Sequence, residues 1–444
     1  MSERTLTEND QRITAVEVAG FKSAMAPVRV NFRDITVLAG VNSAGKSTLM
    51  QPLLLMKQTM EKPFDPGGLA IDGPLVSFSL ADQFLSGSTT NATTNSFSIA
   101  FTLTTGWIKL YYGRLDSGAF GNTKIDFKSG TKLSSWTENQ IFDIDDAKFQ
   151  EAIGQRSLMI SLQDAFPDIK VKISHDRGML AISVHDDKSR ANTRWFHIDS
   201  PTTAIAKQAL ELIYLPGLRG NPQRNYFISA VGPQYPGRFS DYVASVVHRW
   251  EDEKDDRINL LTNNMRRLNL TSRISTKLID DTRVEVHVGR LPVAARGSTR
   301  DTVNIADVGF GVSQTLPVLV AFLAAAPGQM VYVEQPELHL HPRAQVALAD
   351  IIVQAADRGA RVIIETHSSL LILALQTAIA EGRIATDRVS MNWFTRDNKG
   401  QTHVAEAEFA KDGSYGDWPV DFDDVESDLQ NRYLNLVDRL RAEG

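Results

Sequence analysis

The stretch Gly40-Val41-Asn42-Ser43-Ala44-Gly45-Lys46-Ser47-Thr48 decides the fold, because it follows an apolar run (ITVLA, residues 35–39) with the spacing GxxxxGK[ST]. Glycines at its first and sixth positions let successive backbone N–H groups turn inward on a phosphate, which then lies at the N-terminus of the next helix. In such a loop the lysine reaches the β- and γ-phosphates, and the serine hydroxyl binds Mg²⁺. We therefore expect these residues to bind a nucleotide: Asn42, Ser43, Ala44, Gly45, Lys46, Ser47 and Thr48.

The flanking segments place this loop at the carboxyl end of a strand. Residues 30–32 and 35–39 are predicted as β segments around a turn at Arg33 and Asp34, and residues 13–18 alternate like a half-buried strand. Together they predict an antiparallel entrance to the loop, where a phosphate loop lies in α/β sheets. Pro52 lies a few residues into the helix and has no N–H, so we expect a kink or a disturbed second turn there.

The composition indicates a globular protein with a large core. The chain has 444 residues, 42% hydrophobic and 23% charged, enough for two or three domains. The net charge of -6 argues against a broadly basic surface, so nucleic-acid binding has to be argued from a local site. The absence of cysteine excludes disulfides and thiolate chemistry. The polar N-terminus is unlike a signal peptide and the longest apolar run, residues 316–326, is too short for a membrane span, so we expect a cytoplasmic protein with no membrane partner.

A β-rich region is predicted beyond the helix that follows the loop. Four β-rich segments separated by Gly, Asn and Asp predict a meander packed on the nucleotide-binding sheet: residues 75–80, 96–103, 107–112 and 124–127. Gln83 follows the first of them. It could contact the γ-phosphate through Mg²⁺ or water, or it could simply be solvated.

A loop rich in turn-forming residues is predicted near the middle of the chain. Residues 214–226 combine Pro, Gly and Asn with two arginines, Arg219 and Arg224. Loops of this composition either present charges to a ligand or cap a sheet, and the sequence leaves both interpretations open.

Glycines recur before a second predicted helix. Gly309, Gly311 and Ser313 precede an apolar helix predicted over residues 315–326. Glycines at a helix N-terminus can face a phosphate, but this element has no lysine of its own. The alternative is a tight glycine turn before a buried helix.

The run MVYVEQPELHLHP (residues 330–342) describes a buried strand that delivers a carboxylate, Glu334, to Mg²⁺ beside the phosphate loop. The next helix is delimited by Pro342 near its first turn and by Gly359 just past its end. His339 and His341 alternate with leucines. Without a third ligand in range they favour a phosphate-side or subunit-contact role over a zinc site.

A further predicted strand, residues 361–365, leads to His367. Ser368 or Ser369 can cap the helix that follows and runs to Gly382. A histidine at the carboxyl end of a strand in an α/β sheet lies at the ligand crevice. After a phosphate loop and an acidic strand, we interpret His367 as a γ-phosphate sensor rather than as an ordinary loop histidine.

Four motifs follow one another along the chain: the phosphate loop (residues 40–48), the glycine segment (residues 309–314), the acidic strand (residues 331–337) and His367. Their order resembles that of the ABC-type ATPases of the SMC, RecF and OLD kind. The wording EQPELHLHP (residues 334–342) is similar to a prokaryotic AAA-family ATPase branch that includes the PtuA and AriA subunits of anti-phage systems. The resemblance covers residues 13–59 and 304–394 well and is thin between them.

This resemblance implies a role for each motif. Lys46 and Ser47 would bind phosphate and Mg²⁺, Glu334 would be the metal-coordinating acid, and His367 would be the switch histidine. Gly309 to Ser313 would be the signature segment, which touches ATP bound to the opposite subunit. ATP would then be sandwiched between the heads of a homodimer or a higher homo-oligomer.

The chain departs from the family pattern at two motifs. Gln335 stands where the catalytic glutamate usually lies, and a glutamine can orient water but cannot accept its proton. Glu337 is the nearest acid, so we count Glu334, Gln335, Glu337 and His367 as catalytic candidates. The signature segment lacks the usual Ser-Gly-Gly wording. No heptad repeat lies between phosphate loop and signature, so no long coiled coil is expected.

The predicted fold is an α/β ABC-type P-loop ATPase head with an antiparallel β subdomain and an inserted mixed or helical lobe. We expect a flexible tail over residues 1–12, a nucleotide-binding lobe from residues 13–133 and 328–444, and a second lobe over residues 134–327 that ends in the signature helix.

The favoured function is a slowly hydrolysing ATPase that needs ATP and Mg²⁺ and serves as a sensor or scaffold in a prokaryotic anti-phage system with a separate effector protein. One alternative is a RecF-like DNA-repair ATPase that binds duplex DNA. The other is an ATP-gated interaction module that does not hydrolyse, which Gln335 suggests.

Overall fold

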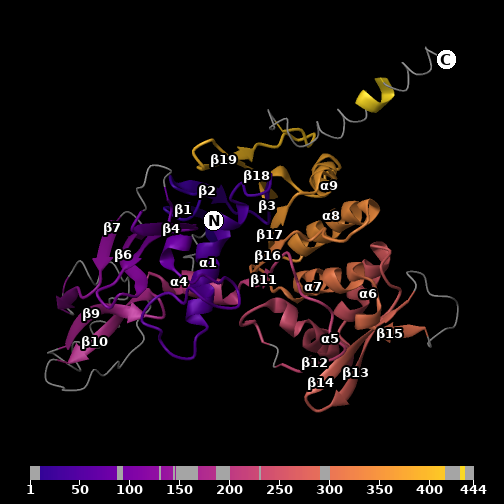
Figure 1. Cartoon of the computed structure of the whole chain (residues 1–444), viewed down its shortest axis with the longest axis horizontal. Coiled ribbons are helices and arrows are strands. Elements are labelled where there is room, and N and C mark those ends of the chain that lie inside the picture. The colour runs from indigo at the N-terminus through magenta and orange to yellow at the C-terminus, as the bar shows by residue number, and fades with distance from the viewer. Residues whose placement is uncertain are drawn as a thin grey trace, which may run out of the picture.

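The computed structural model describes residues 11–87, 94–129, 132–143, 146, 169–186, 201–229, 232–290, 301–415 and 431–435. Most of the tail predicted over residues 1–12 lies outside the described residues. In Figure 1 the central sheet stands between a β-rich part, in indigo and purple, and a helical part, in orange.

The central sheet has six strands and is parallel except at one edge. Its strand order is β11-β16-β17-β3-β18-β19, and only the β18–β19 pair is antiparallel. The strands, in that order, are Ile213–Leu215, Met330–Glu334, Arg361–Thr366, Ile35–Gly40, Val389–Arg396 and Thr402–Ala407. The strand before the phosphate loop, β3, therefore lies between two strands from the far end of the chain.

Beside it lies a six-stranded antiparallel sheet of order β2-β1-β4-β5-β6-β7. The strands, in that order, are Val28–Asn31, Ile13–Ala19, Ser96–Leu103, Gly106–Arg114, Phe120–Ser129 and Lys132–Thr137. The predicted antiparallel pairing of the first two strands is confirmed. β3 belongs to the central sheet and not to this one. One expectation is wrong: residues 75–80 form no strand and have only an isolated bridge between Asp72 and Ser77.

Two smaller sheets lie farther out. A three-stranded sheet joins β8 (Ile141–Asp143), β9 (Ile169–Asp176) and β10 (Met179–Asp186). Another contains β12 (Tyr226–Phe227), β13 (Ile274–Asp280), β14 (Arg283–Gly289) and β15 (Thr302–Asn304). The latter packs against α5.

The central sheet is buried on both faces, and alternate residues enter different cores. In β16, Met330 and Tyr332 join the core shared with the antiparallel sheet, whereas Val331 and Val333 join the core on the helical side. Such continuous apolar strands are typical of parallel sheets covered on both faces. The division of the chain into the two predicted lobes remains a prediction, but β11 lies within residues 134–327 and is an edge strand of the central sheet.

The helices cover these faces. α1 (Lys46–Met60) packs on the antiparallel side with α4 (Thr203–Glu211). The other face is covered by α5 (Val243–Asp252), α6 (Arg257–Arg267), α7 (Phe310–Ala324), α8 (Pro342–Asp357) and α9 (Ser369–Ala380). Short 3-10 turns, η2 to η5, lie at Ala81–Gln83, Phe239–Tyr242, Ile305–Asp307 and Thr386–Arg388.

Helix boundaries follow the local sequence. Pro342 occupies the first turn of α8, and the Ser368 hydroxyl accepts the Leu371 N–H at the start of α9, as predicted. α1 runs as one helix through Pro52. The longest of these helices, α8, has 16 residues, so the described chain contains no long coiled coil and no helix long and apolar enough to cross a bilayer. The predicted α/β class with an antiparallel subdomain is confirmed.

Candidate nucleotide site

The phosphate loop joins the end of β3 to the start of α1, as the sequence predicts. Three of its residues have left-handed backbone angles, with φ of 141° at Gly40, 62° at Ser43 and 100° at Gly45. At Gly40 and Gly45 neighbouring atoms also leave no room for a side chain. A Cβ on Gly40 would lie 2.3 Å from the Phe394 carbonyl oxygen, and one on Gly45 would lie 2.2 Å from Thr402 Oγ1.

Lys46 is folded back on its own loop. Its Nζ donates to the carbonyl oxygens of Gly40 at 3.0 Å and Val41 at 2.9 Å, and the side chain is buried. Burial lowers the pKa of the Lys46 ammonium, and the nearby carboxylates of Glu365 and Glu337 oppose that shift. The cation is therefore already ordered in the place where a phosphate would bind.

The strand-end acid singled out by the sequence, Glu334, lines the same cavity as the phosphate loop, but its hydrogen-bond partners lie elsewhere. Its Oε1 accepts from the Tyr214 hydroxyl at 3.0 Å and lies 3.2 Å from the Tyr332 hydroxyl oxygen, and its Oε2 accepts from the N–H of Gly217 at 3.1 Å. Burial raises the pKa of the Tyr214 hydroxyl, and negative charge on Glu334 raises it further. The expected partnership of Ser47 with Glu334 is not the contact that the structure shows.

The carboxylate that meets Ser47 is Glu365, the last acid of β17. Ser47 Oγ lies 3.1 Å from Glu365 Oε1 and 2.9 Å from Oε2, and Tyr332 donates to Oε2 at 3.0 Å. Burial raises the pKa of Glu365, as does the charge of Glu334, whereas Ser47, Lys46 and Tyr332 lower it.

Sequence reasoning gave Glu365 no role, although an acid closing an apolar strand beside His367 was visible there. β16 and β17 are parallel neighbours in register Glu334 with Glu365, which brings the two acids side by side.

The phosphate loop and the acids enclose one cavity of about 530 Å³. Its walls include seven of the predicted residues, together with Glu365: Asn42, Ser43, Lys46, Ser47, Glu334, Gln335 and His367. Burial lowers the pKa of His367, as does the charge of Lys46, while a hydrogen bond with the Gly40 backbone raises it. Its imidazole is therefore neutral at neutral pH and can accept or donate one hydrogen bond.

A second cavity of about 540 Å³ lies on the other side of Lys46 and Ser47. Gln83 lines it, together with Lys22, Arg396 and Glu365. The expected position of Gln83 at a strand end is wrong, since it closes the 3-10 turn η2 and its Oε1 accepts from the Ser79 N–H at 2.8 Å. Its proposed contact with the γ-phosphate stays a prediction.

Glu337 lies beneath the first cavity rather than in its wall. Its Oε1 accepts from Thr366 Oγ1 at 2.7 Å and from the His367 N–H at 3.1 Å. The side chain is buried, and its Oε2 has no hydrogen-bond partner in the part of the chain that the structure describes. Gln335, with φ of 45°, turns the chain between Glu334 and this buried acid.

The predicted signature segment lies apart from the phosphate loop of its own chain. Gly309 caps α7 and is exposed, Phe310 is 52% exposed, and Ser313 is buried with its hydroxyl donating to the Phe310 carbonyl at 3.2 Å. Ser313 lines a third cavity, of about 430 Å³, instead of the nucleotide cavity.

The two histidines of the acidic motif have local structural contacts. His341 caps α8, its Nδ1 accepting the Arg343 N–H at 3.3 Å, and the His339 ring lies 5.8 Å from the Phe310 ring. A subunit-contact role for His339 beside the exposed Phe310 stays a prediction.

The loop with two arginines caps the central sheet. Arg219 donates to the carbonyls of Gln314, Glu334 and Gln335, which ties α7 to the end of β16. Burial lowers the pKa of Arg219 to about 10, while Glu337 and Glu334 oppose the shift. Arg224 forms an ion pair with Asp307 at 2.7 Å.

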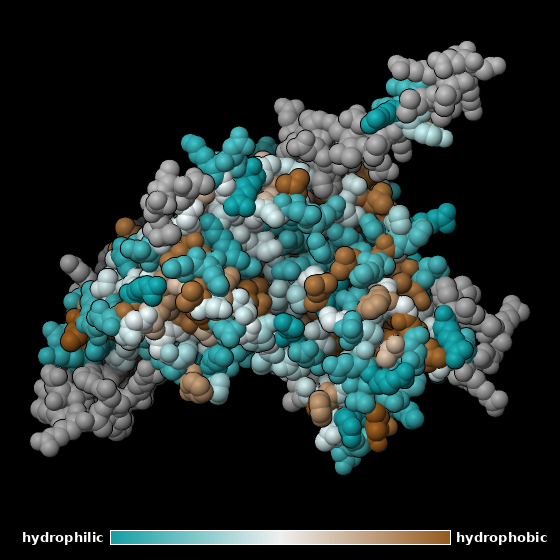
Figure 2. Space-filling model, viewed as in Figure 1, coloured by the Kyte–Doolittle hydropathy of each residue, from teal (hydrophilic) through white to brown (hydrophobic). Residues whose placement is uncertain are grey.

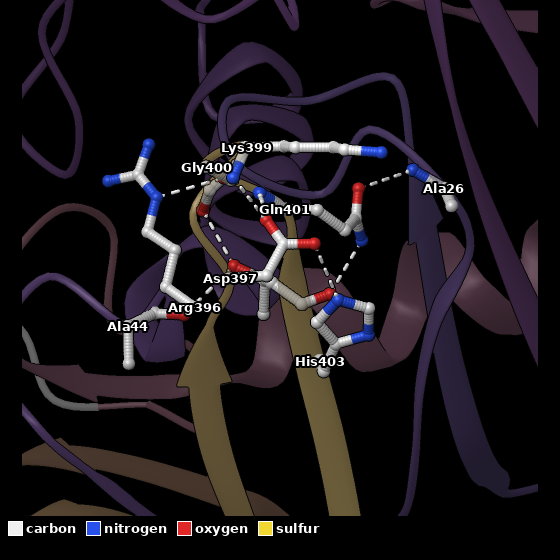
Figure 3. A network of polar contacts seen from close by, with 10 residues as sticks. Ala26, Ala44, Arg396, Asp397, Lys399, Gly400, Gln401 and His403 are labelled. Atoms are coloured by element: carbon white, nitrogen blue, oxygen red, sulfur yellow. Dashed lines mark hydrogen bonds and ion pairs between the residues drawn. The ribbon is translucent and has the colours of Figure 1, made fainter.

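The tip of the β18–β19 hairpin braces the phosphate loop from outside. Figure 3 shows Asp397 organising the turn around Gln401, whose side chain accepts the Ala26 N–H at 2.9 Å. Next to it, Thr402 Oγ1 lies 2.8 Å from both the Ala44 carbonyl and the Ser23 hydroxyl. The loop is therefore held by chain segments on both sides of it in sequence.

The oxygen donors of the cavity fit Mg²⁺. A hydroxyl and carboxylates are hard ligands, and Mg²⁺ is usually bound by one or two carboxylates together with substrate phosphates and water. In the part of the chain that the structure describes, no group of three or more His, Asp or Glu could hold an ion by itself. An ion here would depend on the phosphates of the nucleotide for its remaining ligands.

Comparison with known families matches more than half of the chain. Residues 12–283 match the family described as "AAA ATPase domain", and residues 223–374 match the one described as "AAA domain, putative AbiEii toxin, Type IV TA system". A search of the curated proteins found no match.

Similar solved structures include three SMC heads. One, bound to the C-winged helix domain of ScpA, is 11% identical with a TM-score of 0.48 and coverage of 90% of this chain and 98% of that one. One from Pyrococcus furiosus is 10% identical with a TM-score of 0.47, and the match covers 97% of this chain and 100% of that one. One from Thermotoga maritima is 11% identical with a TM-score of 0.38, and the match covers 89% of this chain and 99% of that one. At these scores the strand order above, rather than the likeness, establishes the fold.

Proposed function

This chain belongs to the family of AAA ATPase domains, and from that premise we propose that it binds Mg²⁺-ATP and hydrolyses it slowly, with the arrangement of an ABC-type head. One observation carries the proposal. The phosphate loop with Lys46 and Ser47, two strand-end acids and His367 all line one cavity, although they come from three separate segments of the chain.

Each of these groups has a definite task in phosphoryl transfer. Lys46 exchanges its loop carbonyls for phosphate oxygens, and the backbone N–H groups at the start of α1 face the same anion. Mg²⁺, when bound, neutralises charge on the phosphates. His367, neutral at neutral pH, is placed to hydrogen-bond a γ-phosphate oxygen.

Slow turnover follows from the residues available to the attacking water. Gln335 lines the cavity and can orient water by hydrogen bonds, as glutamines do in some GTPases, but it cannot take a proton. Glu337 has one carboxylate oxygen without a partner but lies beneath the wall. Because phosphoryl transfer depends mainly on positioning and charge stabilisation, the reaction proceeds slowly with Glu337 as a base outside the cavity wall.

A closed site needs a second copy of the chain. The exposed Gly309 and Phe310 at the start of α7 do not reach the nucleotide cavity of their own chain. We propose that they cover the γ-phosphate held by a partner head, so that ATP closes a homodimer or a higher homo-oligomer. The start of a helix without its own lysine supports this role, since its partial positive charge suits an anion.

For the cellular role we propose a cytoplasmic sensor or scaffold in a prokaryotic anti-phage system, acting with a separate effector protein. The motif wording and the match of residues 223–374 to a family whose description names a toxin–antitoxin system support it. A RecF-like ATPase that binds duplex DNA is the second candidate, and a nucleotide-gated module without turnover is the third.

Two measurements test these proposals. Titration of wild-type protein with Mg²⁺-ATP, followed by single-turnover hydrolysis, should give tight binding with turnover well below one per second. Absence of binding would overturn the nucleotide function, and absence of turnover would leave the gated module.

Affinity purification of the ATP-locked protein from its native cell should recover a toxin or nuclease. Recovery of repair proteins or DNA instead would favour the second candidate.

A further inference from the structure

The Ser47 hydroxyl of the phosphate loop contacts a different acid from the one that the sequence predicts. It lies between both oxygens of Glu365, at 3.1 and 2.9 Å, and not against Glu334. In a phosphate loop this serine hydroxyl is the protein group that binds Mg²⁺. A carboxylate in direct contact with it therefore lies where the charge of the ion would be.

Glu334, in contrast, has donors on both oxygens that come from elsewhere. Tyr214 belongs to β11 and Gly217 to the loop after it, and both donate to Glu334. Releasing Glu334 toward the phosphate loop would break these hydrogen bonds and leave a buried hydroxyl and N–H without partners, which is costly. Among the described residues the donors to Glu365 are Ser47 and Tyr332, and Ser47 itself belongs to the phosphate loop.

The cavities support the same distinction between the two acids. Glu365 lines both the cavity with His367 and the one with Gln83 and Arg396, whereas Glu334 lines only the first. Lys46 and Ser47 also line both cavities. Glu365 thus lines both cavities together with the phosphate-binding residues, while Glu334 lines one of them.

We propose that Glu365 is the carboxylate that holds Mg²⁺ beside Ser47, and that Glu334 is a positioning residue that orders Tyr214, Tyr332 and the β11 loop. This inference rests on the proposed ATP function. It moves the metal role from the strand before α8 to the strand after it.

The proposal makes an unusual prediction for ATP without metal. A carboxylate next to the phosphate site repels the anionic triphosphate unless a cation lies between them. Removing the charge of Glu365 should therefore strengthen the binding of metal-free ATP while weakening the binding of the ion. A residue with only a structural role would weaken both.

The test is an equilibrium titration of full-length protein with fluorescent N-methylanthraniloyl ATP, in excess Mg²⁺ and in excess EDTA. We expect wild type to bind at least tenfold more tightly with Mg²⁺. In Glu365→Gln this ratio should fall to within about threefold of one, mainly through tighter binding in EDTA. Glu334→Gln, the matched control, should keep the wild-type ratio.

A second readout is direct binding of Mn²⁺ to the nucleotide complex, followed by its electron paramagnetic resonance spectrum. Glu365→Gln should lose at least tenfold in Mn²⁺ affinity, and Glu334→Gln should lose less than threefold. Should Glu365→Gln fail to fold, Glu365→Asp keeps the charge but withdraws it. This variant should have a lower affinity for Mn²⁺, and its affinity for metal-free ATP should stay within twofold of wild type.

Three results would overturn the inference: an unchanged Mg²⁺ ratio in Glu365→Gln, equal weakening with and without the ion, or loss of the ratio in Glu334→Gln alone. Failure of the ATP function itself looks different, because wild type would then bind the analogue in neither condition.

Discussion

The two halves of the expected ATP site differ in how complete they are within one chain. At the phosphate loop, Lys46, Ser47, Glu365 and His367 line one cavity, and the carbonyls of Gly40 and Val41 already accept from Lys46. At the signature segment, Gly309 and Phe310 are exposed and lie away from that cavity. In the proposed function the first half binds a nucleotide by itself, and the second acquires a ligand only when another molecule brings one.

The surface around the phosphate loop agrees with a contact of this conditional kind. Figure 2 shows apolar side chains interspersed with polar ones on the visible face. Val41 of the phosphate loop is 50% exposed, and Leu218, which lines the nucleotide cavity, is 82% exposed. A contact that mixes such groups with polar ones suits a dimer that opens and closes, since permanent interfaces are more apolar.

The largest expected effect is at the first half. Lys46→Ala should abolish Mg²⁺-ATP binding, by at least about a hundredfold, because it removes charged hydrogen bonds to the phosphates and takes a cation away from the carboxylates of Glu365 and Glu337. Isothermal titration calorimetry measures the loss, and thermal melting checks that the fold remains. The control is Lys399→Ala, an exposed lysine on the hairpin tip, which should bind as wild type does. Wild-type affinity in Lys46→Ala would remove the central assignment.

A smaller effect, limited to assembly and turnover, is expected at the second half. Gly311→Asp should still bind ATP but lose ATP-driven dimers and at least tenfold in turnover, since its charge would oppose the γ-phosphate of the partner. Light scattering with and without ATP measures the dimer.

One mixture and one control variant sharpen this result. Lys46→Ala mixed with Gly311→Asp should restore at most half of the composite sites. Gly311→Ala is the control for crowding alone, because its Cβ would lie 3.3 Å from the His339 carbonyl oxygen. Full activity of Gly311→Asp by itself would show that the signature interpretation is mistaken.

The chemical step should respond to Glu337 more than binding does. Glu337→Gln should lower single-turnover hydrolysis about tenfold with little change in ATP affinity, because the side chain lies beneath the cavity and not in its wall. Gln335→Glu should leave turnover unchanged or raise it, since it introduces a base into the wall. Unchanged turnover in Glu337→Gln would exclude Glu337 from the chemistry.

The smallest effect tests whether the β18–β19 hairpin stabilises the phosphate loop. Thr402→Val should lower the free energy of unfolding by about 1–2 kcal/mol, because the buried contacts to Ala44 and Ser23 are lost. ATP affinity should fall by less than tenfold. Thr395→Val, at an exposed position of the same hairpin, is the control. Denaturant unfolding gives the comparison, and equal stability of both variants would show that the brace contributes nothing.

Local motifs made much of the fold predictable. The phosphate loop, the caps of α8 and α9 and the first antiparallel strand pair all depend on residues close in sequence, and the structure confirms them. Residues 75–80 were misassigned because their β-forming composition carries no information about pairing, and tertiary context decides such segments.

The site was less predictable than the fold, because its decisive contacts join distant segments. Glu334 and Glu365 end similar apolar strands, and the sequence alone does not show which one meets Ser47. The choice depends on Tyr214 and Gly217, more than 100 residues away, which hold Glu334. Register between parallel strands is set by the whole sheet, so it has no local pattern.

The placement of β3 also has a consequence for synthesis on the ribosome. This strand is fully buried between β17 and β18, both made more than 300 residues later. At about 5–20 residues per second, β3 waits roughly 15 to 70 s for its neighbours. β1, β2 and β4 to β6 pair among themselves and can form during that interval. The nascent chain therefore carries an unpaired apolar strand for most of translation, and chaperones that shield such segments should decide how much of this protein a cell obtains.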